Sequence, residues 1–260
     1  MNLFNFDPST ILSFFLTLFR ISLVLFLLPF FGGESLPKPV KAVVCIILTL
    51  GLWPALSFPA RYFPAHPFNI LIMILGELVL GLTMGLLVRF LFAAIQTGGE
   101  LAGFQMGFSM INIMDPINGT SESVTAHFLY MTSLLTFLCL NGHLYLLKAL
   151  AQSFELVPPG SLFISPQLVQ NIITFSGQIF VLAIKIAAPI ITAIFLVDLA
   201  LALISRAAPQ MNVLFVGFPI KICVGFLFLG LLFEVMNMEI ANFIRNISIY
   251  FDSILRAMIP

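Results

Sequence analysis

Apolar residues gather into six long segments along this chain, and short stretches rich in proline, glycine and polar residues separate them. The segments cover residues 10–31, 40–56, 68–95, 124–147, 172–204 and 213–233. Helices are predicted for all six, because a helix satisfies its backbone hydrogen bonds internally where water is absent. The pattern therefore predicts an all-α membrane protein.

The six segments differ in length. Segment 40–56 would span about 25 Å as a helix and segment 172–204 about 50 Å, against a hydrocarbon core of about 30 Å. Pro189 lies inside the longest segment, where the missing N–H and the ring are expected to kink the helix. Long, kinked helices are therefore predicted, and we expect the longest to project beyond the bilayer.

The amino-acid composition also indicates a membrane protein. Apolar residues make up 60% of the chain and charged residues 8%, and the mean hydropathy is +1.13, all of which are typical of an integral membrane protein. The formal net charge is zero, so no nucleic-acid partner is indicated. Basic residues fall on both sides of the segments, so charge alone predicts no topology.

Six charged residues lie inside apolar segments: Arg20, Glu77, Arg89, Lys185, Asp198 and Lys221. Each would cost roughly 2.5–3.5 kcal/mol if it faced acyl chains at the centre of a bilayer. Those that share a segment are too far apart to meet at the three- or four-residue spacing of helix neighbours. We therefore expect all six to contact other helices or other subunits.

Residues 98–116 combine glycine and methionine at regular spacing. Gly99, Gly103 and Gly107 recur at intervals of four, as do Met106, Met110 and Met114. Glycine allows close helix approach and methionine adapts to changing shapes. Two interpretations follow, a tightly packed helix pair or a deformable constriction in a channel.

Other residues predict where a helix in this region ends and where the helix before it packs closely. Asp115 before Pro116 is expected to end any helix there. Gly81 and Gly85 repeat the four-residue spacing in the preceding segment, where close helix packing is predicted.

Beyond residue 233 the chain becomes amphipathic. One helical stripe about 120° wide carries the apolar residues: Ile240, Phe243, Ile244, Ile247, Phe251, Ile254, Leu255 and Met258. Such a helix is expected to lie on a membrane surface or to dock on a partner, and the weakly basic polar face favours docking.

Motifs for catalysis, metals and cofactors are missing from the sequence, which predicts that the chain is not an enzyme and holds no metal or cofactor. Two other classes stay open. A secondary transporter would use Glu77 and Asp198 as intramembrane charges. An intramembrane serine protease would use Ser109, although Met110 replaces the small residue expected after such a serine.

One stretch, RAAPQMNVLFVGFPIK at residues 206–221, resembles the signature of the FliR-type flagellar export-gate family and its injectisome counterparts. Further landmarks follow in the family's order along almost the whole chain, and the match favours the flagellar branch. They are Arg20 ahead of Pro29 and Gly32, Gly76 with Glu77, residues 98–108 followed by Asp115 and Pro116, and Ser153, Phe154, Val157, Pro158 and Gly160.

The resemblance implies a structural component of the type III export gate in the bacterial inner membrane, at the flagellar basal body. One copy would join several copies of FliP and FliQ in a helical hetero-oligomer around a closed pore, with FlhB at the cytoplasmic entrance. Unfolded export substrates would pass through this pore, and membrane lipid would surround the assembly.

The resemblance also implies a division of the chain and roles for its residues. Residues 1–171 would form a FliP-like part with a plug-like segment at 106–122, residues 172–233 a FliQ-like helical hairpin, and residues 234–260 a C-terminal amphipathic helix. Arg206, Pro209, Gln210 and Asn212 would form the cytoplasmic hairpin tip. The gate and plug would comprise Gly103, Met106, Gly107, Phe108, Met110, Met114, Asp115 and Pro116, with Gly81, Gly85 and Gly99 as helix-packing glycines.

Overall fold

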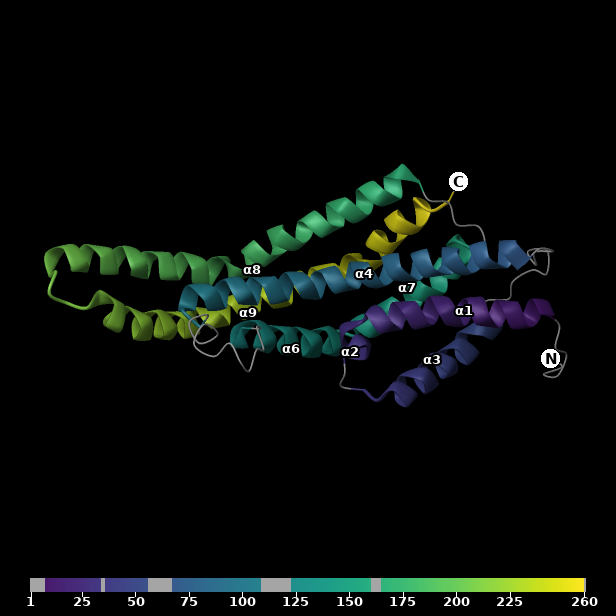
Figure 1. Cartoon of the computed structure of the whole chain (residues 1–260), viewed down its shortest axis with the longest axis horizontal. Helices are drawn as coiled ribbons and strands as arrows, with labels where there is room; N and C mark the ends of the chain where they lie inside the picture. The colour runs from purple at the N-terminus through teal and green to yellow at the C-terminus, as the bar shows by residue number, and fades with distance from the viewer. Residues whose placement is uncertain (1–7, 34–35, 56–66, 109–122, 160–164, 260) are drawn as a thin grey trace. The chain divides into compact units, whose positions relative to one another are not determined.

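The computed structural model describes residues 8–33, 36–55, 67–108, 123–159 and 165–259, and the regular secondary structure within these ranges is helical (Figure 1). The helices are α1 (Pro8–Leu27), α2 (Pro29–Gly32), α3 (Lys38–Leu52), the 3₁₀ turn η1 (Trp53–Ala55), α4 (Pro67–Met106), α6 (Val124–Cys139), α7 (Gly142–Leu156), α8 (Pro166–Ala207) and α9 (Val213–Arg256). The prediction of an all-α protein is confirmed.

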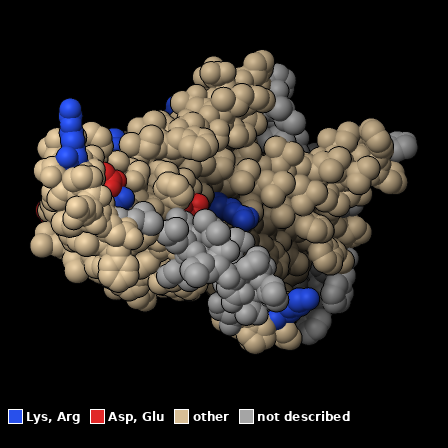
Figure 2. Space-filling view, turned by 60° about the vertical axis from the view of Figure 1, so that its left-hand side comes forward, with Lys and Arg blue, Asp and Glu red and all other residues tan. Residues whose placement is uncertain are grey.

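Four helices are long and apolar enough to cross a membrane. They are α1, α4, α8 and the part of α9 from Phe215 to Arg256, and the bent pair of α6 and α7 would make a fifth span. Figure 2 shows one face of the molecule, on which charged side chains are few and most of the surface is uncharged. The chain is therefore an all-α membrane protein.

Two predicted segments are broken where the local sequence cannot continue a helix. α1 ends at Leu27 because Pro29 has no N–H, and the short α2 begins with that proline. Residues 124–147 form two helices, because Asn141 has φ 57° between them. Asparagine tolerates this left-handed conformation better than most residues.

Three other helices are longer than predicted, among them α8, which has 42 residues and begins and ends outside the predicted segment 172–204. α4 joins segment 68–95 to the glycine-rich stretch as one helix of 40 residues, and α9 continues past residue 233 as one helix of 44 residues. Pro189 lies inside α8, and Figure 1 shows the ribbon of α8 changing direction along its length.

The amphipathic end of α9 differs from its prediction. Its apolar stripe is buried within the chain, with Ile247 and Met258 completely covered and Ile254 and Leu255 nearly so. The prediction that this stripe lies on a membrane or docks on a partner is therefore wrong. Periodicity identifies a face that needs an apolar neighbour, and here the chain's own helices supply it.

The chain divides into two compact units. Unit 1 comprises residues 1–90, 141–175 and 244–260, and unit 2 comprises residues 91–140 and 176–243, so α4, α8 and α9 contribute to both.

Within unit 1, α3 packs beside α1, and the Trp53 Nε1–H donates to Ser13 Oγ at 3.1 Å. Gly81 and Gly85 of α4 lie against α1 so closely that an added Cβ would come within 2.8 Å of Leu23 Cβ and 2.5 Å of Leu27 Cβ.

Unit 2 has an apolar core built by its parts of α4, α6, α8 and α9. Phe92 of α4 makes edge contacts with Phe137 and Tyr130 of α6, with ring centroids 5.5 and 6.3 Å apart. Ile186 and Ile190 of α8 are completely covered. Large apolar side chains nevertheless remain exposed, such as Phe195, Phe226 and Leu227.

Candidate functional site

A buried ion pair lies at the centre of unit 1. Arg20 of α1 and Glu77 of α4 are 0% and 2% exposed. Arg20 Nε donates to Glu77 Oε2, and Nη2 donates to Oε1 at 2.8 Å. Nη2 also donates to the Val157 carbonyl at 3.0 Å, while Nη1 donates to Ser153 O at 3.0 Å and Oγ at 3.2 Å. All five N–H groups of the guanidinium thus have acceptors.

The same arginine anchors the end of α7. Ser153 and Val157 lie at the C-terminal end of this helix, where the helix dipole favours a cation. The Arg20 guanidinium also stacks over the Phe154 ring, 4.0 Å from its centroid. Arg20 therefore ties α1, α4 and α7 together.

Two more ion pairs join α8 to α9 in unit 2. Lys221 Nζ lies 2.6 Å from Asp198 Oδ1, and Lys185 Nζ lies 3.7 Å from Glu239 Oε1, with the lysine 60% exposed. Each pair joins two helices. Both pairs are partly exposed in this chain, unlike the buried pair of unit 1.

Arg89 differs from the other five charges. Its side chain is exposed on α4, and within the described ranges it has no hydrogen-bond or ion-pair partner. The expectation that all six charges meet other helices or subunits stays a prediction for Arg89.

The tip between α8 and α9 is exposed at Arg206, Pro209, Gln210 and Asn212. Asn212 caps α9, because its Oδ1 accepts a hydrogen bond from the Phe215 N–H at 3.3 Å. Close to the tip, Asp198 and Lys221 line a cavity of about 220 Å³ together with Leu201 and Gly217.

α4 ends at Met106 in a Schellman motif. Gly107 has φ +89°, a conformation that favours glycine. The Gly107 N–H donates to Phe104 O at 3.1 Å, and the Phe108 N–H donates to Gly103 O at 3.0 Å. α4 therefore ends at Met106, while Asp115, which was expected to end any helix there, lies outside the described residues.

Glycines of α4 lie directly against the start of α6. An added Cβ at Gly99 would lie 2.6 Å from the Ala126 Cα, and one at Gly103 would overlap the hydroxyls of Thr125 and Ser123. Thr125 Oγ1 donates to Gly99 O at 3.0 Å. This contact matches the tight helix pair that was one of the two interpretations of the stretch.

Met106 fills the space next to α9. Its side chain is completely buried and packs on Gly225, where an added Cβ would lie 2.5 Å from Met106 Cγ. The ring of Phe108 makes an edge contact with Phe226, with centroids 6.2 Å apart. The remaining residues assigned to the plug, Met110, Met114, Asp115 and Pro116, lie outside the described residues, as does Ser109.

The charged residues are recognisable in the sequence, but their partners are not. Ser153 and Phe154 were noted only as family landmarks, and their contacts with Arg20 depend on the packing of three helices. Gly225 was also missed, although a glycine facing a methionine leaves no distinct signal in one sequence. In the described part of the chain, no group of three or more His, Cys, Asp or Glu side chains could hold a metal ion.

The fold and these contacts describe an integral membrane protein built around enclosed charges and close helix contacts. Residues 11–247 match the family model described as bacterial export proteins, family 1. The chain belongs to this family, which confirms the predicted resemblance.

Curated relatives carry more specific names. The flagellar biosynthetic protein FliR of Escherichia coli K12 is 32% identical over 212 residues, which cover 82% of this chain and 80% of the relative. FliR of Bacillus subtilis is 31% identical over 240 residues, covering 88% and 89%. The Yop proteins translocation protein T of Yersinia pestis is 32% identical over 191 residues, covering 73% and 72%.

Proposed function

We propose that this chain is a structural component of the flagellar type III protein export gate. With FliP and FliQ it would form the closed pore through which unfolded flagellar proteins cross the bacterial inner membrane, with FlhB at the entrance. The observation that carries the proposal is the similarity to FliR proteins over more than four-fifths of the chain.

The exposed surface supports a role inside a larger assembly. Many large apolar side chains on α8 and α9 have no covering within the described part of the chain, with Phe215 and Leu227 81% and 75% exposed. Monomeric soluble proteins seldom expose such patches. Lipid alone would cover such apolar residues but would not satisfy Arg89, which is exposed on α4.

The proposal assigns roles to the parts of the chain. Residues 1–171 would act as the FliP-like part, residues 172–233 as the FliQ-like hairpin with its tip toward the cytoplasm, and residues 234–260 as the C-terminal helix. The plug-like segment would comprise residues 106–122, and the packing of Gly103, Met106, Gly107 and Phe108 would hold its beginning in place. The pore would open and close as the side chains of the plug-like segment repack, and the chain would perform no catalysis.

Charge pairing argues against the transporter alternative. A proton- or ion-coupled carrier needs a carboxylate that can change its partner during transport. Both acceptor oxygens of Glu77 are held by Arg20, and Asp198 lies against Lys221. The export-gate role requires no such exchange.

Mass measurement of the intact assembly tests the proposal. The tagged chain is extracted in mild detergent from cells that carry a flagellar system, purified and weighed by native mass spectrometry. We expect a large hetero-oligomer that contains one copy of this chain with several copies of two smaller membrane proteins. Recovery of the chain alone, active in substrate transport in liposomes, would contradict the proposal.

Deleting residues 109–121 should raise the ion conductance of the purified assembly. This deletion keeps the Met106 packing and the Gly107 cap, so the end of α4 stays intact. Conductance in a planar bilayer is compared with that of the unchanged assembly and of one that carries Gly177→Ala, because nothing lies within 4 Å of a Cβ at that position. Equal conductance for all three would show that this segment does not seal the pore.

A further inference from the structure

The last turn of α4 packs against α9 within unit 2. Met106 is completely buried, whereas Phe104, two positions earlier on the same helix, is 67% exposed. The Met106 side chain covers the backbone of Gly225, which is also buried. A Cβ added at Gly225 would lie 2.5 Å from Met106 Cγ and 2.7 Å from Sδ, and closer still to Cε. All side-chain atoms of Met106 beyond Cβ thus occupy space that any side chain at position 225 would need.

The glycines of α9 differ in what they face. Gly230 has nothing within 4 Å of an added Cβ, and Gly217 faces Leu201 of α8 at 3.1 Å. Within the described part of the chain, only Gly225 among them receives a side chain of α4. A bare backbone lets another helix approach closely, and the unbranched chain of methionine adapts to the space that remains. We call this contact between Met106 and Gly225 the methionine socket.

Two aromatic contacts adjoin the methionine socket. An added Cβ at Gly107 would lie 3.0 Å from the ring of Phe218 on α9. The ring of Phe108 makes an edge contact with Phe226, the residue that follows Gly225. Residues 106, 107 and 108 therefore all contact α9, over about two turns of that helix.

Other helices of unit 2 hold α9 on either side of the socket in sequence. Lys221 Nζ lies 2.6 Å from Asp198 Oδ1 of α8. Asn237 Oδ1 accepts a hydrogen bond from Thr136 Oγ1 of α6 at 3.1 Å. The atoms nearest an added Cβ at Gly225 belong, in contrast, to a flexible side chain. A change in the socket is therefore expected to move the Met106 side chain and to leave α9 in place.

We propose that the methionine socket keeps the pore closed, with Gly225 as the residue that positions Met106. The inference rests on the proposed function, since it requires a pore. In the closed state Met106 fills the socket and holds the end of α4 against α9. In the open state Met106 leaves the socket and the end of α4 separates from α9. Any side chain at position 225 displaces Met106 and so shifts the equilibrium toward the open state.

Gly225→Ala tests the positioning role. We expect the conductance of the purified assembly in a planar bilayer to rise about tenfold, because an overpacking penalty of ordinary size would fall on the closed state alone. The other subunits should be recovered with the variant as they are with the unchanged chain, which distinguishes gating from failure to fold or assemble. Gly230→Ala is the matched control, since its added Cβ meets nothing within 4 Å. It should leave the conductance unchanged.

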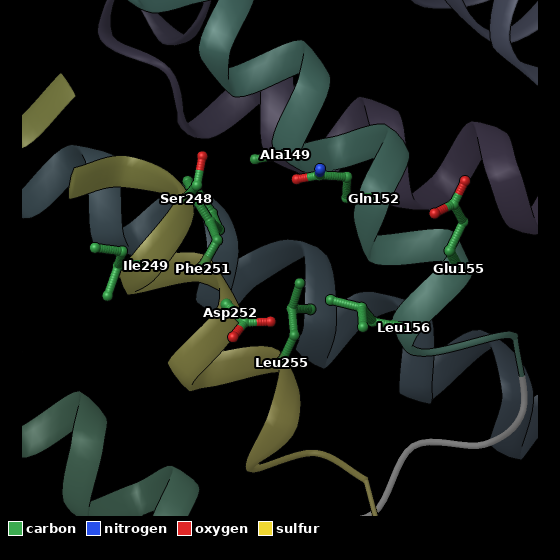
Figure 3. Close-up of a pocket in the computed structure, with 9 residues that line it drawn as sticks. All are labelled: Ala149, Gln152, Glu155, Leu156, Ser248, Ile249, Phe251, Asp252 and Leu255. Carbon is green, nitrogen blue, oxygen red and sulfur yellow. The ribbon is translucent and has the colours of Figure 1, made fainter. Parts of the chain in front are cut away.

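Met106→Ala removes the side chain that fills the socket and should also raise the conductance. Combined with Gly225→Ala it should add nothing further, because both changes break one contact. Ile249→Ala is the control for the loss of apolar atoms. Ile249 is 65% exposed, belongs to the part of α9 in unit 1 and lies at the groove between α7 and α9 (Figure 3). This control should conduct like the unchanged assembly.

A reversible disulfide tests whether Met106 leaves the socket. Because an added Cβ at Gly225 lies 2.5 Å from Met106 Cγ, the two Cβ atoms lie within about 4 Å, as a disulfide requires. Met106→Cys is combined with Gly225→Cys in a chain whose three natural cysteines are replaced by alanine. We expect copper phenanthroline to form the bond in the assembly and to stop export of flagellar proteins into the medium. Reduction with dithiothreitol should restore export, and Met106→Cys alone should export under both conditions.

Three results would overturn the socket proposal alone. They are an intact assembly in which the disulfide does not form, export that continues while the disulfide is in place, and equal conductance of the Gly225→Ala and Gly230→Ala assemblies. Recovery of the chain without any other subunit would overturn the proposed function as well.

Discussion

Arg20→Met should lower the free energy of unfolding by about 3–5 kcal/mol, because it leaves Glu77 charged and unpaired in the core of unit 1. It also removes the donors that hold the Ser153 and Val157 carbonyls at the end of α7. Thermal unfolding of the purified chain in detergent, followed by size-exclusion chromatography, measures the change. In cells, the variant should accumulate poorly and fail to support export.

A double variant separates the ion pair from simple packing. Arg20→Met combined with Glu77→Leu removes both charges, so it should recover part of the stability that Arg20→Met loses. Recovery should be incomplete, because the Val157 carbonyl still lacks its donor. An Arg20→Met chain as stable as the unchanged chain would contradict the role given to this ion pair.

Gly99→Ala should lower the free energy of unfolding by about 1–3 kcal/mol, because overpacking a close helix contact forces the backbones apart. The new Cβ would lie 2.6 Å from the Ala126 Cα, a backbone atom that cannot rotate away. Separation of α4 from α6 would also strain the hydrogen bond from Thr125 Oγ1 to Gly99 O. Export, measured as swimming in soft agar after complementation of a deletion strain, should fall in parallel.

Gly230→Ala provides the matched control for this prediction. An added Cβ at Gly230 of α9 meets nothing within 4 Å, and alanine favours a helix by about 0.5–1 kcal/mol over glycine. Gly230→Ala should therefore retain or raise stability and retain export. Equal behaviour of the two variants would show that close contact between α4 and α6 does not matter.

Helix positions were largely readable from the sequence, whereas helix ends were not. Apolar segments predicted the helices because hydropathy is a property of each residue and its neighbours in sequence. The break at Asn141 lies inside an apolar run, so composition did not reveal it. The end of α4 depended on Gly107 adopting φ +89°, while the proline at 116 was the stronger signal in the sequence.

The charged residues of the candidate site could be predicted from the sequence, whereas the residues that they contact could not. A charge in an apolar segment is visible in a sequence, so Arg20 and Glu77 could be recognised as residues that need partners. The identity of those partners was not visible, because Ser153 and Val157 lie more than 130 positions from Arg20. The stripe of α9 shows the same limit, since periodicity predicted an apolar face but assigned it the wrong neighbour.

The sequence by itself determined that this is an all-α membrane protein of the bacterial export family, because hydropathy and motifs are local properties of the chain. Only the tertiary structure decided which charges pair, which glycines carry close helix contacts and that the end of α9 is buried within the chain. Those outcomes depend on which helix faces meet, and residues far apart in the chain set that choice together.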